Sequence, residues 1–299
     1  MRRRQLLPAL AGTVVVLILT LAMSPTGGAQ TGPPKVDRLR MYVFDLGFIA
    51  VPDASALFTE PLEVAPDVCC IIVGHLIVHP KGTLIWDVGL VPDALIGASG
   101  SATDPTGQPL SQRPGRPLTE QLAEIGYTPD DVTYVALSHY HFDHTANANL
   151  FENSTWITQK AERDAMFAGE PVPGVGPEPS SHYNELRSSK SIILSNVDEY
   201  DVFGDGTVII KSAPGHTPGH QVLILKLPET GTVMLAGDLY HFPEEREAQR
   251  VPVIEFDKEQ SRQTRVQIEE YVRRHSMPMW IEHDAHQYAK IEMSPAYIE

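Results

Sequence analysis

Apolar residues recur along most of the chain in short runs rich in β-branched side chains, and Pro or Gly bounds many of these runs. Such runs predict strands. The expected strands are 41–46, 68–78, 83–87, 132–138, 155–158, 201–203, 207–211, 221–226, 232–236 and 279–281. Apolar residues at helical spacing predict helices over 118–125, 160–167 and 258–275. Because helices separate several of the strands, we expect a mixed α/β fold built of layers.

The first 29 residues do not follow this pattern. Three arginines follow Met1, an uncharged apolar stretch runs from Leu6 to Met23, and small residues lead to Ala29. This order is typical of an export signal. We therefore expect cleavage near residue 29, one domain over residues 30–299, and a periplasmic or secreted protein. An uncleaved membrane anchor stays open, because the apolar stretch is just long enough to span a bilayer.

The composition limits the partners. The full chain of 299 residues carries a net charge of −15, and loss of residues 1–29 removes three arginines and no acid, which gives −18. An acidic surface of this size disfavours nucleic acid and, after signal cleavage, a membrane surface. The two cysteines, Cys69 and Cys70, are adjacent, so a strain-free disulfide between them is not expected. Stability must then come from the core and from any bound metal.

A cluster of histidines follows the strand predicted over 132–138. Three histidines and one aspartate stand within six residues, at His139, His141, Asp143 and His144. His139 and His141 are two residues apart and can point to the same side of an extended segment. Imidazole and carboxylate are ligands that suit Zn²⁺ and similar ions. One short loop could therefore supply two ligands to each of two adjacent ions.

Further residues of ligand type follow three later strands. His216 lies in a turn with Gly215 and Gly219, while Asp238 and His283 each come directly after an apolar strand. Glycine frees the backbone for the tight turn that would carry His216. Scattered histidines would not collect at strand ends in this way, so the pattern favours a metal site over a solvated histidine-rich loop.

These residues resemble the metallo-β-lactamase superfamily, whose His-x-His-x-Asp-His signature stands at 139–144. The resemblance implies a four-layered αβ/βα sandwich and two divalent metal ions, zinc first among them. It places His139, His141 and His216 on one ion, Asp143, His144 and His283 on the other, and Asp238 between the two. A shared water with a lowered pKa would be the nucleophile.

Within the superfamily, the segments 215–221, 237–240, 283–284 and 295–298 are similar to those of the N-acyl-homoserine lactonases. This similarity implies hydrolysis of a small lactone, most of all the ring opening of N-acyl-homoserine lactones that underlies quorum quenching. Those lactonases place a tyrosine three residues after the bridging aspartate. Here His241 stands in that position and Tyr240 one residue earlier. Tyr240 and His241 are therefore the two candidates for the hydrogen bond to the carbonyl oxygen, and Asp238, as the bridge between the ions, is the third predicted catalytic residue.

Two supporting predictions and four alternatives complete the interpretation. Asp87, at a strand end, is expected to orient a ligand histidine, and exposed loop residues Leu57 and Phe58 would allow a homodimer. A β-lactamase of the same fold commonly lacks the bridging aspartate, and a glyoxalase II-type thioesterase would need a basic site that the ligand loops do not offer. An oxygen reductase of this superfamily usually has a carboxylate at the position of His141. A dioxygenase with one iron would leave Asp238 or His283 without a metal.

Overall fold

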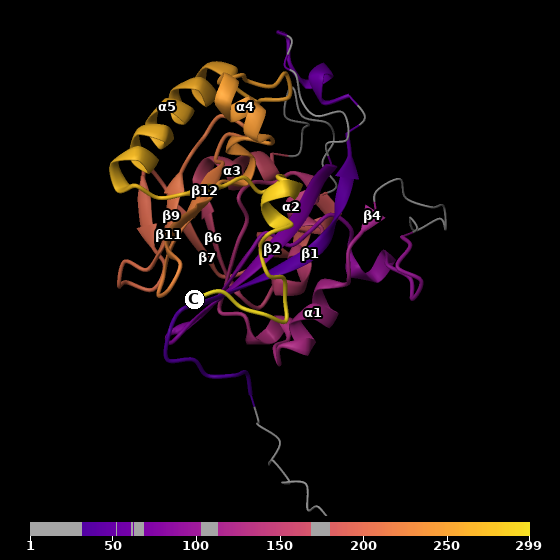
Figure 1. Ribbon diagram of the computed structural model, residues 1–299. Helices are drawn as coiled ribbons and strands as arrows, with labels where there is room; N and C mark the ends of the chain where they lie inside the picture. The colour runs from indigo at the N-terminus through magenta and orange to yellow at the C-terminus, as the bar shows by residue number, and fades with distance from the viewer. Residues whose placement is uncertain (1–31, 52, 61, 63–68, 103–112, 169–179) are drawn as a thin grey trace, which may run out of the picture. The chain divides into compact units, whose positions relative to one another are not determined.

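The computed structural model of the protein describes residues 32–51, 53–60, 62, 69–102, 113–168 and 180–299 (Figure 1). Residues Gly32–Glu299 form one compact unit. The predicted signal at 1–29 lies outside the described residues. Across the part that is described, helices are too short or too polar to cross a membrane.

Two sheets carry the fold. The first has the order β4-β1-β2-β3-β5-β6-β7, and its last four strands run parallel. The second has the order β12-β11-β10-β9-β8. The strands of the first sheet are β1 (Arg40–Ala50), β2 (Cys69–His79), β3 (Gly82–Trp86), β4 (Arg113–Pro114), β5 (Tyr134–Ala136), β6 (Thr155–Gln159) and β7 (Ser191–Leu194). Those of the second are β8 (Glu199–Asp201), β9 (Val208–Ser212), β10 (Gln221–Leu227), β11 (Gly231–Leu235) and β12 (Met279–Trp280).

Helices lie at the outer faces of these sheets and at the ends of several strands. The α-helices are α1 (Leu118–Glu124), α2 (Phe142–Thr145), α3 (Lys160–Met166), α4 (Pro243–Ala248), α5 (Lys258–His275) and α6 (Ala285–Tyr288). Short 3₁₀ helices are η1 (Ala54–Leu57), η2 (Asp93–Leu95), η3 (Pro129–Asp131), η4 (Ala148–Phe151), η5 (Ser180–His182), η6 (Asn184–Arg187) and η7 (Gly237–Leu239).

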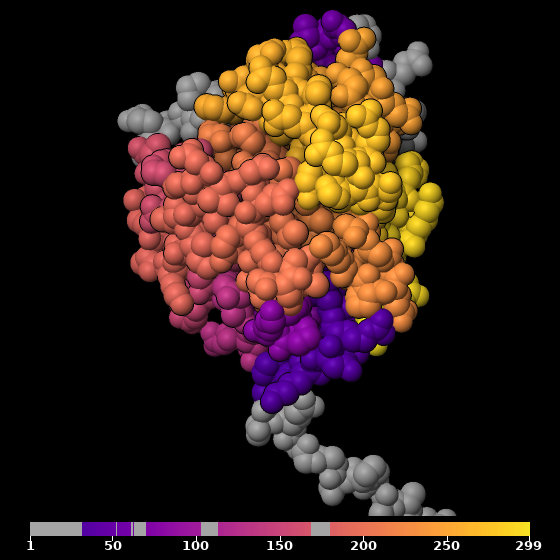
Figure 2. All heavy atoms as spheres, turned by 90° about the vertical axis from the view of Figure 1, so that its left-hand side faces the viewer, coloured from indigo at the N-terminus to yellow at the C-terminus, as the bar shows by residue number. Residues whose placement is uncertain are grey.

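Three apolar clusters define four layers. One joins the outer face of the first sheet to α1, through residues such as Phe44 and Leu122. The second fills the space between the sheets, where Trp86 faces side chains such as Leu223. The third joins the second sheet to α5 through Ile268 and its neighbours. In Figure 2 the second sheet's segments and α5, in salmon to yellow, cover most of the face turned to the viewer. The four-layered αβ/βα sandwich is confirmed.

Most predicted elements are present with small shifts at their ends. The helix over 258–275 has the bounds of α5, which begins after the Asp257 cap, whose carboxylate accepts two backbone N–H groups. The strand expected at 201–203 lies two residues earlier, as β8. Strand β7 and helix α4 were not expected: β7 is four residues long, and α4 begins at Pro243 directly after the Asp238 region.

The surface role expected of Phe58 is wrong. Its side chain is 7% exposed and packs with Leu62, Cys70 and Phe242 in a small cluster of its own. Phe58 is therefore part of the core and is not presented to a partner. A homodimer stays a prediction without this support.

Candidate metal centre

Five segments meet at the end of the two sheets where the strands carrying the candidate ligands finish. The loop after β5 supplies four of the seven predicted residues, and the segments after β9, β11 and β12 supply one each. The fifth segment, after β3, supplies Asp87. Because the sandwich brings these strand ends together, residues from both halves of the chain become neighbours. The seven residues follow strand ends as expected, and their role as metal ligands stays a prediction.

Three imidazoles converge on one point. The Nδ1 atom of His141 lies 2.8 Å from Nε2 of His139 and 2.9 Å from Nε2 of His216. With Asp238 these residues offer ligand atoms that all lie within 4.8 Å of one another. His139 and His216 are buried, whereas His141 is partly exposed. This group has the residue types and spacing to hold one ion.

A second group lies beside the first. Asp143, His144 and His283 also bring their ligand atoms within 4.8 Å, and all three are buried. The Oδ2 atom of Asp143 is 3.8 Å from Nε2 of His144 and 3.7 Å from Nε2 of His283. This group can hold a second ion.

Asp238 stands between the groups and turns one oxygen to each. Its Oδ1 atom lies 3.1 Å from Nε2 of His144 and 3.0 Å from Nε2 of His283. Its Oδ2 atom lies 3.3 Å from Nε2 of His216 and 3.7 Å from Nε2 of His139. A carboxylate placed in this way can bridge two ions.

Two glycines allow the ligand segments to come this close. A Cβ atom on Gly215 (φ +140°) would lie 2.5–2.6 Å from atoms of Ser261 on α5. On Gly237 (φ +50°) it would lie 2.7 Å from Ser138 and 2.8 Å from the ring of His220. Both positions need glycine for the backbone angle and for the space.

Three of the candidate ligand rings, His144, His216 and His283, are oriented through their second nitrogen. Asp87 accepts the Ser138 backbone N–H at 2.7 Å, and its other oxygen lies 3.0 Å from Nδ1 of His144. Nδ1 of His283 lies 3.0 Å from the Ile71 carbonyl oxygen, to which it donates. Nδ1 of His216 lies 3.3 Å from Glu255. Such partners fix the tautomer and raise ligand basicity, and Asp87 occupies the place predicted for it.

Two buried residues join the ligand loops to each other. Glu162, on α3, accepts the backbone N–H groups of Tyr140 and Gly219 and the hydroxyl of Thr217, each at 2.8 Å. His220 accepts the Asp238 backbone N–H at 3.0 Å and contacts the Ala213 carbonyl oxygen through Nδ1. Glu162 had no signal in the sequence, and His220 supports the turn that carries His216.

The site concentrates negative charge in the interior. Buried acidic side chains surround it at Asp87, Asp143, Asp238, Glu162, Glu245 and Glu255, with Arg265 buried among them. Burial and Asp87 raise the pKa of a further acid, Glu282, well above its usual value, so it adds no charge. Burial lowers the pKa of His139 and of His141 well below the usual value, which leaves neutral rings suited to metal. Burial also lowers the pKa of His216, but the carboxylates of Glu255 and Asp238 outweigh it and raise that pKa to about 9.

The charge balance calls for cations. Burial opposes ionisation of Asp238, yet the His283, His144 and His139 imidazoles hold its pKa well below the usual value. Nε2 of His144 and Oδ1 of Asp238 are buried, lie 3.1 Å from each other and have no further hydrogen-bond partner among the described residues. Buried charges and unpaired polar atoms are costly unless a partner offsets them. Divalent ions fit these residues, because they would contact both atoms and offset the carboxylates.

The two candidates for the carbonyl oxygen lie in different places. The Tyr240 hydroxyl accepts a hydrogen bond from Gln249 at 3.2 Å, and the Arg265 guanidinium lies 4.6 Å from its ring. The Tyr240 ring packs under α5 and not at the candidate ligands, so its position does not support the catalytic role, which stays a prediction. His241 does reach the centre, with Nε2 at 3.3 Å from Oδ2 of Asp238.

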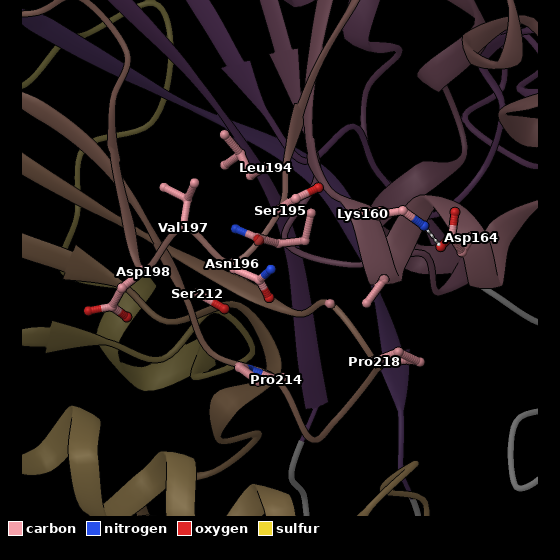
Figure 3. A pocket seen from close by; sticks show the side chains of 13 residues that line it. Lys160, Asp164, Leu194, Ser195, Asn196, Val197, Asp198, Ser212, Pro214 and Pro218 are labelled. Atoms are coloured by element: carbon pink, nitrogen blue, oxygen red, sulfur yellow. Dashed lines mark hydrogen bonds and ion pairs between the residues drawn. The ribbon is translucent and has the colours of Figure 1, made fainter.

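A pocket of about 500 Å³ lies beside the turn that carries His216 (Figure 3). It is bounded by Pro214, Pro218 and Gly219 of the His216 turn on one side and by α3 and the segment after β7 on the other. None of the seven predicted ligands lines it. The pocket is thus a surface feature beside the centre, and the ligand groups define the site.

Comparison with known proteins agrees with this geometry. The family model of the metallo-β-lactamase superfamily matches residues 69–272. N-acyl homoserine lactonase AttM of Rhizobium radiobacter is 28% identical over 237 residues, which are 74% of this chain and 85% of that protein. N-acyl homoserine lactonase AiiA of Bacillus thuringiensis subsp. kurstaki is 28% identical over 236 residues, 75% of this chain and 85% of that one.

A solved structure shows the same fold. An N-acyl homoserine lactone hydrolase with the product N-hexanoyl-L-homoserine bound at its catalytic metal center superposes with a TM-score of 0.68 and 25% identity. The match covers 88% of this chain and all of that one. The family match, the fold and the converging ligand residues agree, and this chain belongs to the metallo-β-lactamase superfamily.

Proposed function

We propose that this protein is a two-metal hydrolase that opens lactone rings, with N-acyl-homoserine lactones as its substrates. The observation that carries the proposal is the position of Asp238, which turns one carboxylate oxygen to each group of ligands. A complete pair of groups joined by a carboxylate supports a two-metal hydrolase over enzymes of this fold that use one ion.

The chain's own residues would hold the reacting groups in place. His139, His141, His216 and Asp238 would hold one ion, and Asp143, His144, His283 and Asp238 the other. Two divalent ions, once bound, polarise the lactone carbonyl and make a water nucleophilic at neutral pH. Asp87 and Glu255 keep the ligand rings in the tautomer that offers Nε2 inward. Zinc suits these ligands and is our proposed metal.

Access to the centre is from the side of His141. His141 and Phe142 are partly exposed, whereas the other six predicted ligands are buried. A lactone would therefore approach past Phe142, whose ring offers an apolar contact to the substrate. The relatives support the substrate class, since the matched proteins carry the name N-acyl homoserine lactonase and one solved relative holds N-hexanoyl-L-homoserine.

A ring-opening assay tests the proposal. Opening of a lactone releases a proton, so a pH indicator follows the reaction of the purified, metal-loaded protein with N-hexanoyl- and N-decanoyl-L-homoserine lactone. We expect turnover of both. Nitrocefin and a glutathione thioester serve as comparison substrates, and turnover of either one without any lactone would overturn the proposal.

Metal content gives a second, separate check. We expect elemental analysis of the protein, purified without added chelator, to find two divalent ions per chain. One iron per chain would contradict the two-metal centre whatever the substrate assay shows. Zinc, cobalt, manganese and iron all tolerate these ligands, so activity is compared after reconstitution with each.

We further propose that the protein works outside the cytoplasm. The support is the order of basic, apolar and small residues over 1–29. Cell fractionation with intact-mass measurement tests this proposal: we expect mature protein that begins near residue 30 in the exported fraction. Full-length protein in the cytoplasm would refute export.

A further inference from the structure

One histidine at the centre is not among the seven predicted ligands. His241 follows η7 and is 5% exposed, so its ring is buried beside the ligand groups. The ring lies 5.2 Å from that of His216 and stacks parallel to that of His283 at 6.0 Å. His241 therefore lies between a candidate ligand of each group, although it is not among the four residues whose ligand atoms all lie within 4.8 Å of one another.

His241 and His216 are built into the site in the same way. Nε2 of each lies 3.3 Å from the same oxygen, Oδ2 of Asp238. Nδ1 of each faces a buried glutamate, Glu255 at 3.3 Å for His216 and Glu245 at 3.2 Å for His241. This is the arrangement in which a carboxylate orients a metal-bound histidine.

A single arginine connects the two pairs. The guanidinium of Arg265, on α5, lies 2.6 Å from Glu245 and 3.4 Å from Glu255. Glu245 also accepts the His241 backbone N–H at 2.8 Å, which fixes the start of α4 over the ring. Arg265 and both glutamates are buried. Arg265 thus forms a buried ion pair with each of the two glutamates that contact the rings, although burying such charges costs desolvation free energy.

The contact between Nδ1 and Glu245 bears on which of two roles the neutral ring can take. When Nδ1 donates to Glu245, the neutral ring presents a lone pair at Nε2. That lone pair suits a cation, whereas it cannot donate to a carbonyl oxygen as a tyrosine hydroxyl would. Nε2 is buried and makes no hydrogen bond within the described residues. In this neutral tautomer the His241 ring can bind a metal ion through Nε2.

We propose that His241 binds the same metal ion as His139, His141 and His216. This position would then have four imidazoles and Asp238, whereas the other has Asp143, His144, His283 and Asp238. Five protein ligands disfavour the tetrahedral geometry of zinc and favour ions that accept five or six ligands. The inference rests on the two-metal part of the proposed function and is independent of the substrate.

Cobalt(II) binding tests this role without reference to activity. Metal-free wild-type protein, His241→Phe and Glu245→Gln are titrated with Co²⁺ and followed by visible absorption and by competition with a chromophoric chelator. His275→Phe is the matched control, because it removes an exposed histidine at the end of α5. We expect His241→Phe to weaken one of the two sites by about tenfold or more and to intensify the absorption as the ligand number falls.

Glu245→Gln keeps the ring but changes its partner, so we expect a smaller loss at the same site. If His241→Phe binds both ions with the affinity and spectrum of His275→Phe, the inference is wrong. Lactone assays do not enter this result: protein that binds Co²⁺ as expected but opens no lactone refutes the proposed substrate and leaves the ligand role standing.

A measurement on the wild-type protein covers the case in which the His241→Phe variant does not fold. In the zinc-loaded protein, long-range ¹H–¹⁵N spectra distinguish protonated, lone-pair and metal-bound imidazole nitrogens. The two predicted ligand groups contain five histidines. We therefore expect one metal-bound nitrogen more than these five supply, from His241. A lone-pair or protonated Nε2 for His241 would overturn the inference.

Discussion

The two halves of the metal centre are supported in different ways. The half with His139, His141 and His216 is held by charged side chains, through Glu255 and Arg265 of the region around α5. The half with His144 and His283 is held by the strands themselves, through Asp87 directly after β3 and the Ile71 carbonyl of β2. One half therefore depends on buried ion pairs and the other on the backbone of the first sheet.

The strand-supported half carries local strain. Asp87 has a φ of 53°, a left-handed conformation that costs glycine least and that asparagine and aspartate adopt more readily than other residues. Its carboxylate is fully buried, and the carboxyl group of Glu282 lies within the same small group. Burial and the neighbouring Asp87 raise the pKa of Glu282 well above its usual value, which keeps it a neutral acid. The strain is offset by the two hydrogen-bonding partners of Asp87.

The largest expected effect comes from the residue that both halves share. Asp238→Asn keeps the shape of the side chain but turns an NH₂ group toward one half. We expect loss of one of the two ions and about a thousandfold or greater loss of lactone turnover, since the two-metal arrangement is removed. Elemental analysis and the pH-indicator assay measure both. Two ions per chain with activity within tenfold of wild type would show that Asp238 does not bridge.

Asp87→Asn tests the strand-supported half. Asparagine tolerates the left-handed backbone, and one oxygen must still accept the Ser138 N–H. Its NH₂ group then faces Nδ1 of His144 and drives the proton to Nε2, where the metal should bind. We expect about a hundredfold weaker binding at this half, at the upper end of the range for such partners.

The measurement is chelator competition, and the ion in the other half is the internal control. Equal weakening of both ions would mean that Asp87 supports the fold as a whole and not one ligand. Thermal unfolding of the metal-free variant checks that the backbone conformation is kept.

Glu255→Gln tests the other half, and the structure predicts a smaller loss. The second oxygen of Glu255 accepts from the Ser261 hydroxyl, which can turn and accept from an amide instead. The introduced glutamine can therefore keep its oxygen toward His216, so the tautomer survives and only the charge is lost. We expect about tenfold weaker binding, confined to the His216 half. A loss that exceeds that of Asp87→Asn would refute this comparison of the two halves.

The ligands could be predicted from the sequence because their signal is local. Residues 139–144 form one spaced motif, and His216, Asp238 and His283 each follow a run of apolar residues that predicts a strand. The supporting residues lack such a signal. Glu162, Glu245 and Glu255 stand in polar segments where an exposed glutamate would look the same.

Arg265 shows what additional signal was available. The buried residues of α5 are Ser261, Thr264, Arg265, Ile268 and Val272, which form one stripe at helical spacing. A charged residue on the buried stripe of an amphipathic helix calls for a buried partner. The partners, however, come from segments that only the tertiary fold brings together, so the sequence could indicate the need but not the pairing. The same limit explains why the sequence could not show which way the Tyr240 ring points.

The smallest expected effect comes from a change at Tyr240, and it distinguishes the role of Tyr240 from that of His241. Tyr240→Phe removes the hydroxyl that accepts from Gln249, a bond 3.2 Å long at the edge of α4. Such a hydrogen bond stabilises the fold by about 0.5–1.5 kcal/mol, and the ring still packs against Arg265. We expect lactone turnover and metal affinity within about twofold of wild type, in contrast to His241→Phe, and a slightly lower urea midpoint. A tenfold loss of turnover without loss of metal would instead place the Tyr240 hydroxyl at the substrate. The Tyr240 ring would then point toward the metal centre in the working enzyme.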